Sequence, residues 1–222
     1  MVNLVIKDIL IQKKTLLFTF FYTIFISICF YSANPSDLGL YVLAPILNTY
    51  MHIITAVNYD DKNKSEIVLN SLPLNREDVV IAKYISIFIF AVIQIIYAIL
   101  IGLIGKAAGF SIYDISISLF DIGSVFASIG IFSAIFFPLY FKFGAIKMRI
   151  FNAILFIIIF IVPMNGISYV TENPNNVFVH KFNLFINNTS SLTINSVVLI
   201  TGLILFMISL TVSIHIYNNK EF

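Results

Sequence analysis

Residues 85–104 read ISIFIFAVIQIIYAILIGLI and contain no charged side chain. A hydrocarbon core about 30 Å thick requires about 20 apolar residues in an α-helix, so this stretch is predicted to cross a membrane. Five further apolar runs lie along the 222 residues, of which 59% are hydrophobic and 11% are charged. A water-soluble chain of that composition would aggregate. We therefore predict an all-α, polytopic membrane protein that forms one transmembrane domain, residues 1–222.

Six transmembrane helices are predicted from these runs. They cover residues 15–32, 38–57, 81–105, 116–140, 150–169 and 195–216. Residues 2–14 precede them and place Asn3, Lys7 and Gln12 on one helical face, a pattern typical of an N-terminal helix at the cytoplasmic interface. Lys83, near the start of the third helix, is predicted to extend its ammonium group toward water at the cytoplasmic edge.

The 13 Lys and Arg residues are distributed unevenly between the two sides of this predicted topology. One side holds Lys7, Lys13, Lys14, Lys62, Lys64, Arg76, Lys83, Lys142, Lys147, Arg149 and Lys220. The other side holds only Lys106 and Lys181. The positive-inside rule places the basic side in the cytoplasm. We therefore predict a protein of the bacterial cytoplasmic membrane with both termini in the cytoplasm.

Motifs of self-sufficient enzymes are missing from the sequence. It contains no His-Glu-x-x-His zinc motif, no Gly-x-Ser-x-Gly nucleophile motif and no Gly-x-x-x-x-Gly-Lys-Ser/Thr phosphate-binding loop. The single cysteine, Cys29, excludes an intrachain disulfide, and a net charge of +2 does not indicate a nucleic-acid partner. We therefore predict that this chain is not an enzyme and binds no metal and no cofactor.

Few polar side chains lie within the predicted helices, and such residues often mark a substrate path. The candidates for a translocation path are Asn48, His52, Gln94 and Asp121. Hydrogen bonds between helices would explain the first three equally well. For Asp121, the alternative is a hydrated position near the outer end of its helix.

The predicted outer connection between the fifth and sixth helices contains an apolar segment. Residues 177–186 read VFVHKFNLFI. A segment of this kind can lie on the outer leaflet, where Phe178, Phe182 and Phe185 are candidates for an outer gate. The alternative is a loop anchored by its aromatic side chains.

The fourth predicted helix has a stripe of small residues. Gly123, Ala127, Gly130 and Ala134 recur at a helical spacing, so a neighbouring helix can approach closely along them. Packing inside the bundle is the favoured interpretation, and a contact between two copies of the chain is the alternative.

The longest predicted cytoplasmic connection, residues 58–80, reads NYDDKNKSEIVLNSLPLNREDVV. Asn63 is predicted to cap a short helix over residues 64–72, which the pair Leu72-Pro73 ends because the residue before proline avoids helical geometry. Asn75 is predicted to cap the following helix in the same way. A solvated linker is the alternative to this short helix.

This connection resembles that of the ABC-2 type exporter permeases. In that family an acidic residue, a short helix, a Leu-Pro pair, a basic residue and a lysine follow one another, and here they fall on Asp60 or Asp61, residues 69–72, Leu72-Pro73, Arg76 and Lys83. Family members often have Gly-Thr where this chain has Lys64-Ser65. The resemblance implies a coupling helix that contacts an ATPase through Asp61, Lys64, Ser65, Glu66, Val68, Leu69, Leu72, Pro73 and Arg76.

The resemblance also implies the partners and the activity. A separate ABC ATPase, present in two copies, would bind ATP and Mg²⁺, and a second permease subunit would form a homodimer or a heterodimer with this chain. The compact size is similar to small Gram-positive permeases, such as the phenol-soluble modulin exporters, which implies efflux of a hydrophobic or amphipathic peptide in toxin secretion or antimicrobial-peptide resistance. The alternative is a non-transporting membrane anchor or sensor that binds a cytoplasmic partner through residues 60–78.

Overall fold

The computed structural model describes residues 1–33, 39–71, 75–109, 117–172, 176–177, 179 and 188–220. Within these residues every regular element is a helix, which confirms the all-α prediction. The elements are α1 (Val2–Ile11), α2 (Lys13–Ala33), the π-helix η1 (Gly39–Leu43), α3 (Ala44–Lys62), α4 (Ser65–Ser71), α5 (Arg76–Ala107), α6 (Leu119–Glu172) and α8 (Ser191–Asn218).

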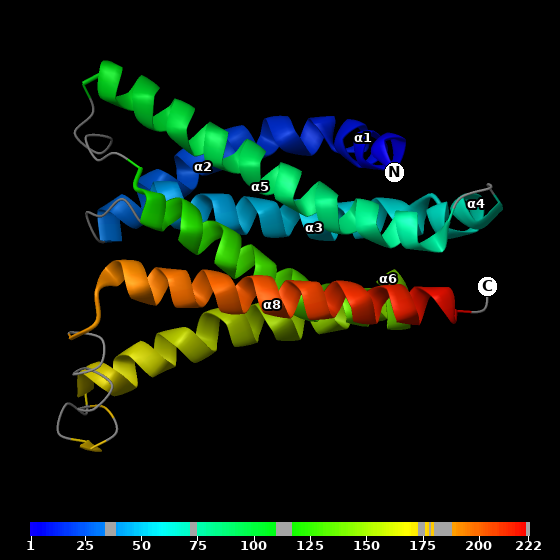
Figure 1. The fold of residues 1–222 in the computed structure, drawn as a ribbon. Coiled ribbons are helices and arrows are strands. Elements are labelled where there is room, and N and C mark those ends of the chain that lie inside the picture. Colours follow the sequence, from blue (N-terminus) through cyan, green and yellow to red (C-terminus); the bar gives the residue numbers. More distant parts are fainter. Residues whose placement is uncertain are drawn as a thin grey trace.

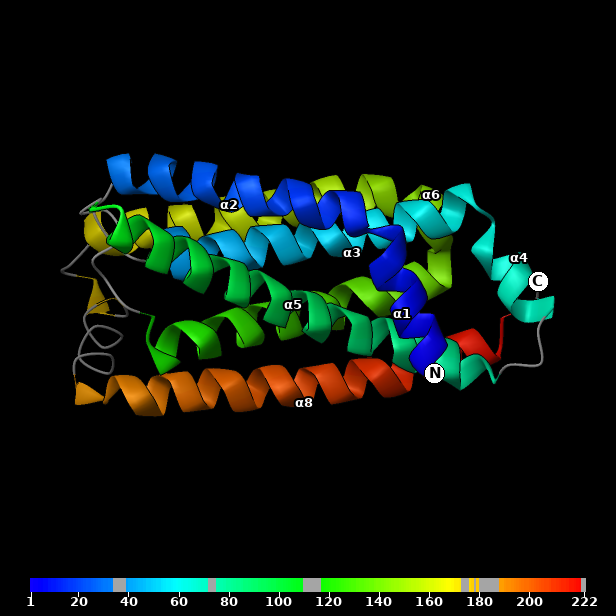
Figure 2. The same ribbon diagram turned by 90° about the horizontal axis from the view of Figure 1, so that it is seen from above.

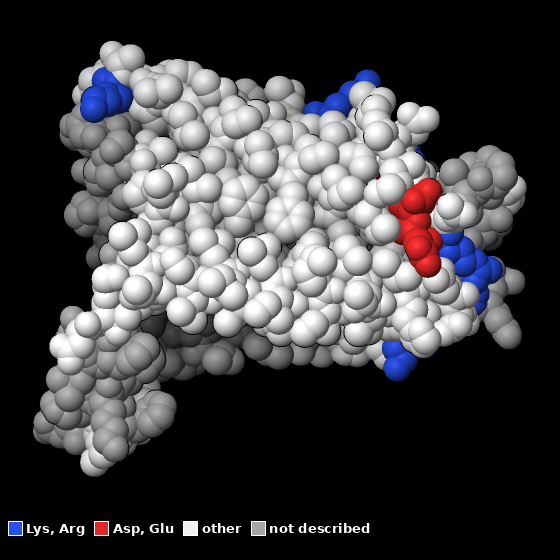
Figure 3. All heavy atoms as spheres, in the orientation of Figure 1, with Lys and Arg blue, Asp and Glu red and all other residues white. Residues whose placement is uncertain are grey.

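The long helices form an elongated bundle in which both chain ends lie at the same end as α4 (Figures 1 and 2). We call this the termini end. On the face shown in Figure 3, charged side chains gather at the termini end and at the far end of α5, whose last turn contains Lys106. Apart from basic side chains on the upper edge of this view, the surface between them is uncharged, as expected for helices surrounded by lipid.

Four helical stretches of the described residues are long and apolar enough to cross a membrane: Gly39–Lys62, Arg76–Ala107, Leu119–Ala145 and Leu192–Asn218. The pair Val2–Ile11 and Lys13–Cys29, bent by 60°, would form a fifth crossing. These stretches establish a membrane protein. The sixth crossing and the interfacial position of α1 remain predictions.

The connection predicted at residues 142–149, between the fourth and fifth helices, is a sharp bend within α6 and not a longer loop. Only Gly144 leaves helical geometry, with φ 76° and ψ 172°. Glycine adopts this φ without the steric penalty of a side chain, so one residue reverses the chain. We call this reversal at Gly144 the α6 elbow. The two arms of α6 then run in opposite directions along the bundle, and the second arm includes the predicted helix 150–169 (Figures 1 and 2).

Helix α3 also extends further than predicted. It ends at Lys62, so residues 58–62, expected in the cytoplasmic connection, form the last turns of a helix. Similarly, α5 begins at Arg76 rather than at residue 81. Polar side chains at a membrane boundary allow a helix to continue into water, and hydropathy therefore sets a span rather than a helix end.

The small-residue stripe of α6 packs against α8, as the favoured interpretation predicted. A Cβ atom on Gly130 would lie 3.6 Å from the carbonyl oxygen of Gly202 in α8, and a Cβ atom on Gly202 would lie 3.3 Å from the carbonyl oxygen of Ala127. The close approach of two backbones explains why small residues are needed on both helices.

Replacing Gly202 by Val is expected to lower the free energy of unfolding by about 1–2 kcal/mol, because the added atoms meet the backbone of α6 and not a flexible side chain. Thermal unfolding of the purified protein in detergent measures this loss. Ser196→Val is the matched control, since Ser196 is an exposed residue of the same helix. Equal stability of the two variants would contradict the proposed contact.

Candidate functional site

The predicted short helix exists, but it begins differently. Asn63 does not cap it; Asn63 ends α3, and its backbone N–H donates to the carbonyl oxygen of Tyr59 at 3.0 Å. Lys64 follows with φ 49°, and α4 spans Ser65–Ser71. The predicted stop at Leu72-Pro73 lies outside the described residues. A single left-handed residue therefore sets the angle between α3 and α4.

The left-handed conformation explains why glycine suits the position of Lys64. This conformation costs a residue with a Cβ atom about 1–2 kcal/mol more than it costs glycine. Lys64→Gly is therefore expected to raise the free energy of unfolding by about 1 kcal/mol, since the greater freedom of glycine in the unfolded chain offsets part of the gain. Thermal unfolding in detergent measures the change. Asn63→Gly, at φ −90°, is the control and should give no gain.

Helix α4 presents an apolar side chain outward at the termini end. Val68 is 55% exposed, whereas Leu69 is partly buried and faces the bundle. Glu66 lies in α4, but its side chain is outside the described residues. Arg76, at the start of α5, donates from its guanidinium group to the carbonyl oxygens of Asn218 at 2.8 Å and Lys220 at 3.0 Å. These contacts of Arg76 hold α5 to the end of α8.

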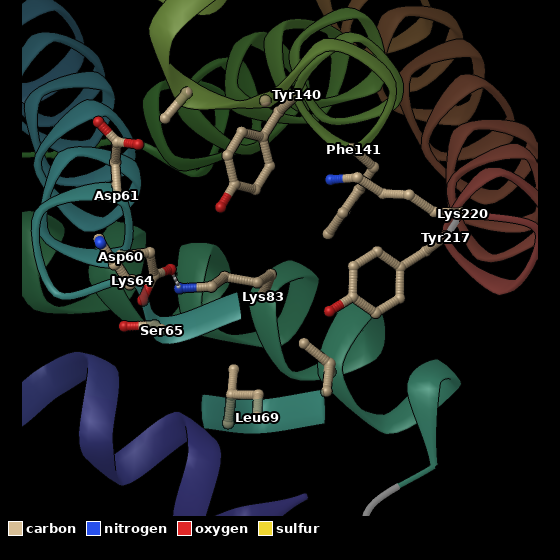
Figure 4. A pocket seen from close by; sticks show the side chains of 13 residues that line it. Asp60, Asp61, Lys64, Ser65, Leu69, Lys83, Tyr140, Phe141, Tyr217 and Lys220 are labelled. Carbon is tan, nitrogen blue, oxygen red and sulfur yellow. Dashed lines mark ion pairs between the residues drawn. The ribbon is translucent and has the colours of Figure 1, made fainter. Parts of the chain in front are cut away.

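A cavity of about 260 Å³ lies between α4 and the bundle (Figure 4). It is lined by Asp60, Asp61, Lys64, Ser65, Leu69, Val79, Lys83, Tyr140, Phe141, Gly144, Ala145, Tyr217 and Lys220. The hydroxyl groups of Tyr140 and Tyr217 point into it (Figure 4). Since α4 forms one wall and the α6 elbow another, a displacement of α4 would change the shape of this cavity.

Four charged side chains form an ion-pair cluster beside the cavity: Lys7 and Asp8 of α1, Asp60 of α3 and Lys83 of α5. The ammonium group of Lys83 lies 2.9 Å from Asp8 Oδ2 and also contacts Asp60 Oδ2. Lys7 lies 3.2 Å from each of the two carboxylates. The predicted extension of Lys83 toward water is therefore wrong, because the residue is 7% exposed and bonded to two carboxylates.

Three of the four predicted path residues come together in the middle of the bundle. His52 Nδ1 lies 2.7 Å from Gln12 Oε1, and Gln94 Nε2 lies 3.0 Å from both His52 Nε2 and Thr19 Oγ1. The amide of Asn48 donates to Thr23 Oγ1 at 2.8 Å. All of these polar side chains are buried, and their hydrogen bonds join α2, α3 and α5.

Asp121 lies apart from this group, at the start of α6. It accepts hydrogen bonds from the backbone N–H of Ser118 at 2.7 Å and from the Ser118 hydroxyl at 2.8 Å, while its own N–H donates to Ser118 Oγ. This reciprocal arrangement is a capping box, and the spacing Ser-x-x-Asp could have revealed it in the sequence. The predicted gate residues Phe178, Phe182 and Phe185 lie outside the described residues.

In the described parts of the chain, no three His, Cys, Asp or Glu side chains lie close enough to hold an ion. The site at the termini end therefore consists of an exposed short helix, a cavity behind it and a paired charge cluster.

The bundle and this site define the chain as a polytopic helical membrane protein with a short helix at its polar end. The model of the ABC-2 family transporter proteins matches residues 3–218, and the chain belongs to that family. Neither the curated proteins nor the solved structures include a match to it. Family membership makes the chain a transporter permease subunit and implies an ABC ATPase as its partner.

Proposed function

We propose that this permease subunit serves an ATP-driven exporter and that α4 is its contact with a separate ATPase. The supporting observation is the position of α4, a short helix behind a left-handed hinge at the termini end with Val68 directed outward. The sequence has no phosphate-binding loop, so ATP and Mg²⁺ would bind to the ATPase. Two ATPase copies and a second permease subunit, identical or homologous, would complete the complex.

In this proposal the termini end faces the cytoplasm of a bacterial cell. Closure of the two ATPases on ATP would move α4, and the moving helix would reshape the cavity behind it. ATP binding would thereby favour one conformation of the bundle over another. This chain would supply contacts and movement, and the ATPase would supply the chemistry.

The proposed cargo is a hydrophobic or amphipathic peptide, exported in toxin secretion or in antimicrobial-peptide resistance. The ion pairs of Lys83 lie near the termini end, whereas the central polar residues His52, Gln94 and Asn48 are hydrogen-bonded to neighbouring side chains. A central region of this kind suits a cargo with few charges, because a charge in the membrane interior is costly unless it is paired.

The test is co-purification with the ATPase encoded beside this chain, together with ATPase turnover in proteoliposomes. Val68→Glu is expected to weaken both by about tenfold or more, because a charged side chain would replace an apolar contact at the centre of the interface. Asn3→Glu adds the same charge at the termini end, on an exposed residue of α1, and should have no effect.

The outcomes separate the proposal from its alternative. Loss of ATPase association in Val68→Glu, with normal folding, would support coupling through α4. If no ATPase associates with the unaltered chain, or if both variants behave alike, the proposal fails. An anchor or sensor that uses residues 60–78 would then be the better explanation.

A further inference from the structure

The ion-pair cluster is a closed ring of alternating charge. Each carboxylate contacts both ammonium groups: Asp8 pairs with Lys7 and Lys83, and Asp60 pairs with the same two residues. The ring is neutral, and its members come from three elements that are far apart in sequence, α1, α3 and α5. Ser86 is a third partner of Asp8 and donates to its Oδ2 atom at 3.3 Å.

The ring is more deeply buried than is usual for charged side chains. The side chains of Asp8, Asp60 and Lys83 are 5%, 9% and 8% exposed, while that of Lys7 is 29% exposed. Transfer of charged groups from water into the protein interior costs free energy, and a buried ion pair is often no more stabilising than apolar side chains of similar volume. Stability alone therefore does not account for the ring. Charges that must face one another do, however, fix the relative position of the helices that bear them.

The ring lies directly at the base of α4. Asp60 is in the last turn of α3, four residues before the left-handed Lys64. Asp60 and Lys83 line the same cavity as Leu69 of α4 (Figure 4). A force applied to α4 would therefore reach the carboxylate of Asp60 through one turn of helix.

From the ring, the connection continues into α1 and α2. Asp8 lies in α1, and one turn later Gln12 bonds to His52 of α3 at the bend of 60° between α1 and α2. Two side-chain contacts therefore hold α1 and its C-terminal end to α3: Lys7 with Asp60, and Gln12 with His52.

We infer that Lys7 and Asp60 are positioning residues of the proposed exporter, and that the ion pair between them transmits the displacement of α4 to α1. The inference rests on the proposed function, since it requires an ATPase that moves α4. It adds to that function a route inside the membrane subunit. The pair of Lys7 and Asp60 couples the polar end of the bundle to the helix that precedes the first crossing, and the pair of Lys83 and Asp8 keeps the buried ring neutral.

The variant Asp60→Leu with Lys83→Met tests this inference. It removes one charge of each sign, and the remaining pair, Lys7 with Asp8, lies within α1 and no longer joins helices. The matched control, Asp8→Leu with Lys83→Met, also removes one charge of each sign but keeps the pair of Lys7 with Asp60 between α1 and α3. Asp60→Asn is a third variant of nearly unchanged shape, in which the partly exposed Lys7 can turn to water.

The readout is the distance between spin labels in the complex with its ATPase, measured by double electron–electron resonance before and after addition of ATP and vanadate. Cys29 is first replaced by Ser. One label pair, Ser71→Cys with Leu205→Cys, reports on α4, and the other, Leu10→Cys with Leu205→Cys, reports on α1; all three labelled positions are exposed.

In the complex with the unaltered ring, both label distances, the one that reports on α4 and the one that reports on α1, are expected to change when ATP and vanadate are added. With Asp60→Leu and Lys83→Met, or with Asp60→Asn, the α4 distance should still change and the α1 distance should not, while the matched control keeps both responses. A normal α1 response in either Asp60 variant would overturn the inference and leave the proposed function intact. No change of either distance in the unaltered ring would refute the proposed function, and the inference with it.

Discussion

Replacing Asp8 by Leu is expected to lower the free energy of unfolding by about 3–5 kcal/mol, the largest effect predicted for a single substitution in this chain. The carboxylate of Asp8 accepts from the ammonium group of Lys83 at 2.9 and 3.0 Å, and Lys83 is 7% exposed. Removal of the Asp8 carboxylate leaves Lys7, Lys83 and Asp60, a buried group with one excess positive charge. Thermal or denaturant unfolding in detergent would measure the loss.

Two further variants make this prediction specific. Lys83→Met in the Asp8→Leu background restores neutrality and should recover most of the lost stability, because a neutral apolar pair can replace a buried ion pair. Glu77→Leu removes an exposed carboxylate from the first turn of α5 and should cost about 1 kcal/mol or less. A similar loss in Asp8→Leu and Glu77→Leu would show that the ring is not buried as described.

The second large effect is expected at Gly102 in α5. A Cβ atom there would overlap the hydroxyl oxygen of Tyr41 and lie 3.2 Å from its Cζ atom. Tyr41 belongs to η1 and is 5% exposed, so its ring has little room to move. Although alanine favours a helix over glycine, Gly102→Ala is expected to lower the free energy of unfolding by about 2–3 kcal/mol, the upper range for overpacking.

Rescue by a second substitution distinguishes this clash from other causes. Tyr41→Phe in the Gly102→Ala background removes the oxygen nearest to the new Cβ atom, so thermal stability in detergent should partly return. Tyr41→Phe in the otherwise unaltered chain should not raise stability. If the double variant is less stable than Gly102→Ala alone, the predicted contact between η1 and α5 is wrong.

The membrane class and the approximate spans could be predicted from the sequence because bilayer thickness sets the length of an apolar helix. The ends of the helices could not be predicted in this way, because a polar segment such as residues 58–62 can form either a helix in water or a loop. The elbow at Gly144 was hidden for a similar reason. It lies between Lys142 and Lys147, and basic residues at a predicted membrane edge indicate a connection but not how short that connection is.

The charged ring illustrates a second limit. Hydropathy identified Lys83 as a residue at the membrane boundary, but its partners Asp8 and Asp60 lie 75 and 23 residues away in the sequence. Such pairing arises only when three helices pack together. Asp8 itself was a usable signal, since a carboxylate among apolar residues of a membrane helix requires a partner. The grouping of His52 with Gln94 was likewise consistent with the predicted hydrogen bonds but not derivable from spacing.

The position of the two chain ends has a practical consequence for stoichiometry. Because both lie at the same end of the bundle, a flexible Gly/Ser linker can join two copies head to tail without crossing the bilayer (Figure 1). Such a tandem polypeptide permits Val68→Glu to be placed in one half only. Its turnover, relative to that of the tandem with two intact halves, would reveal whether one docked ATPase is sufficient to drive the cycle.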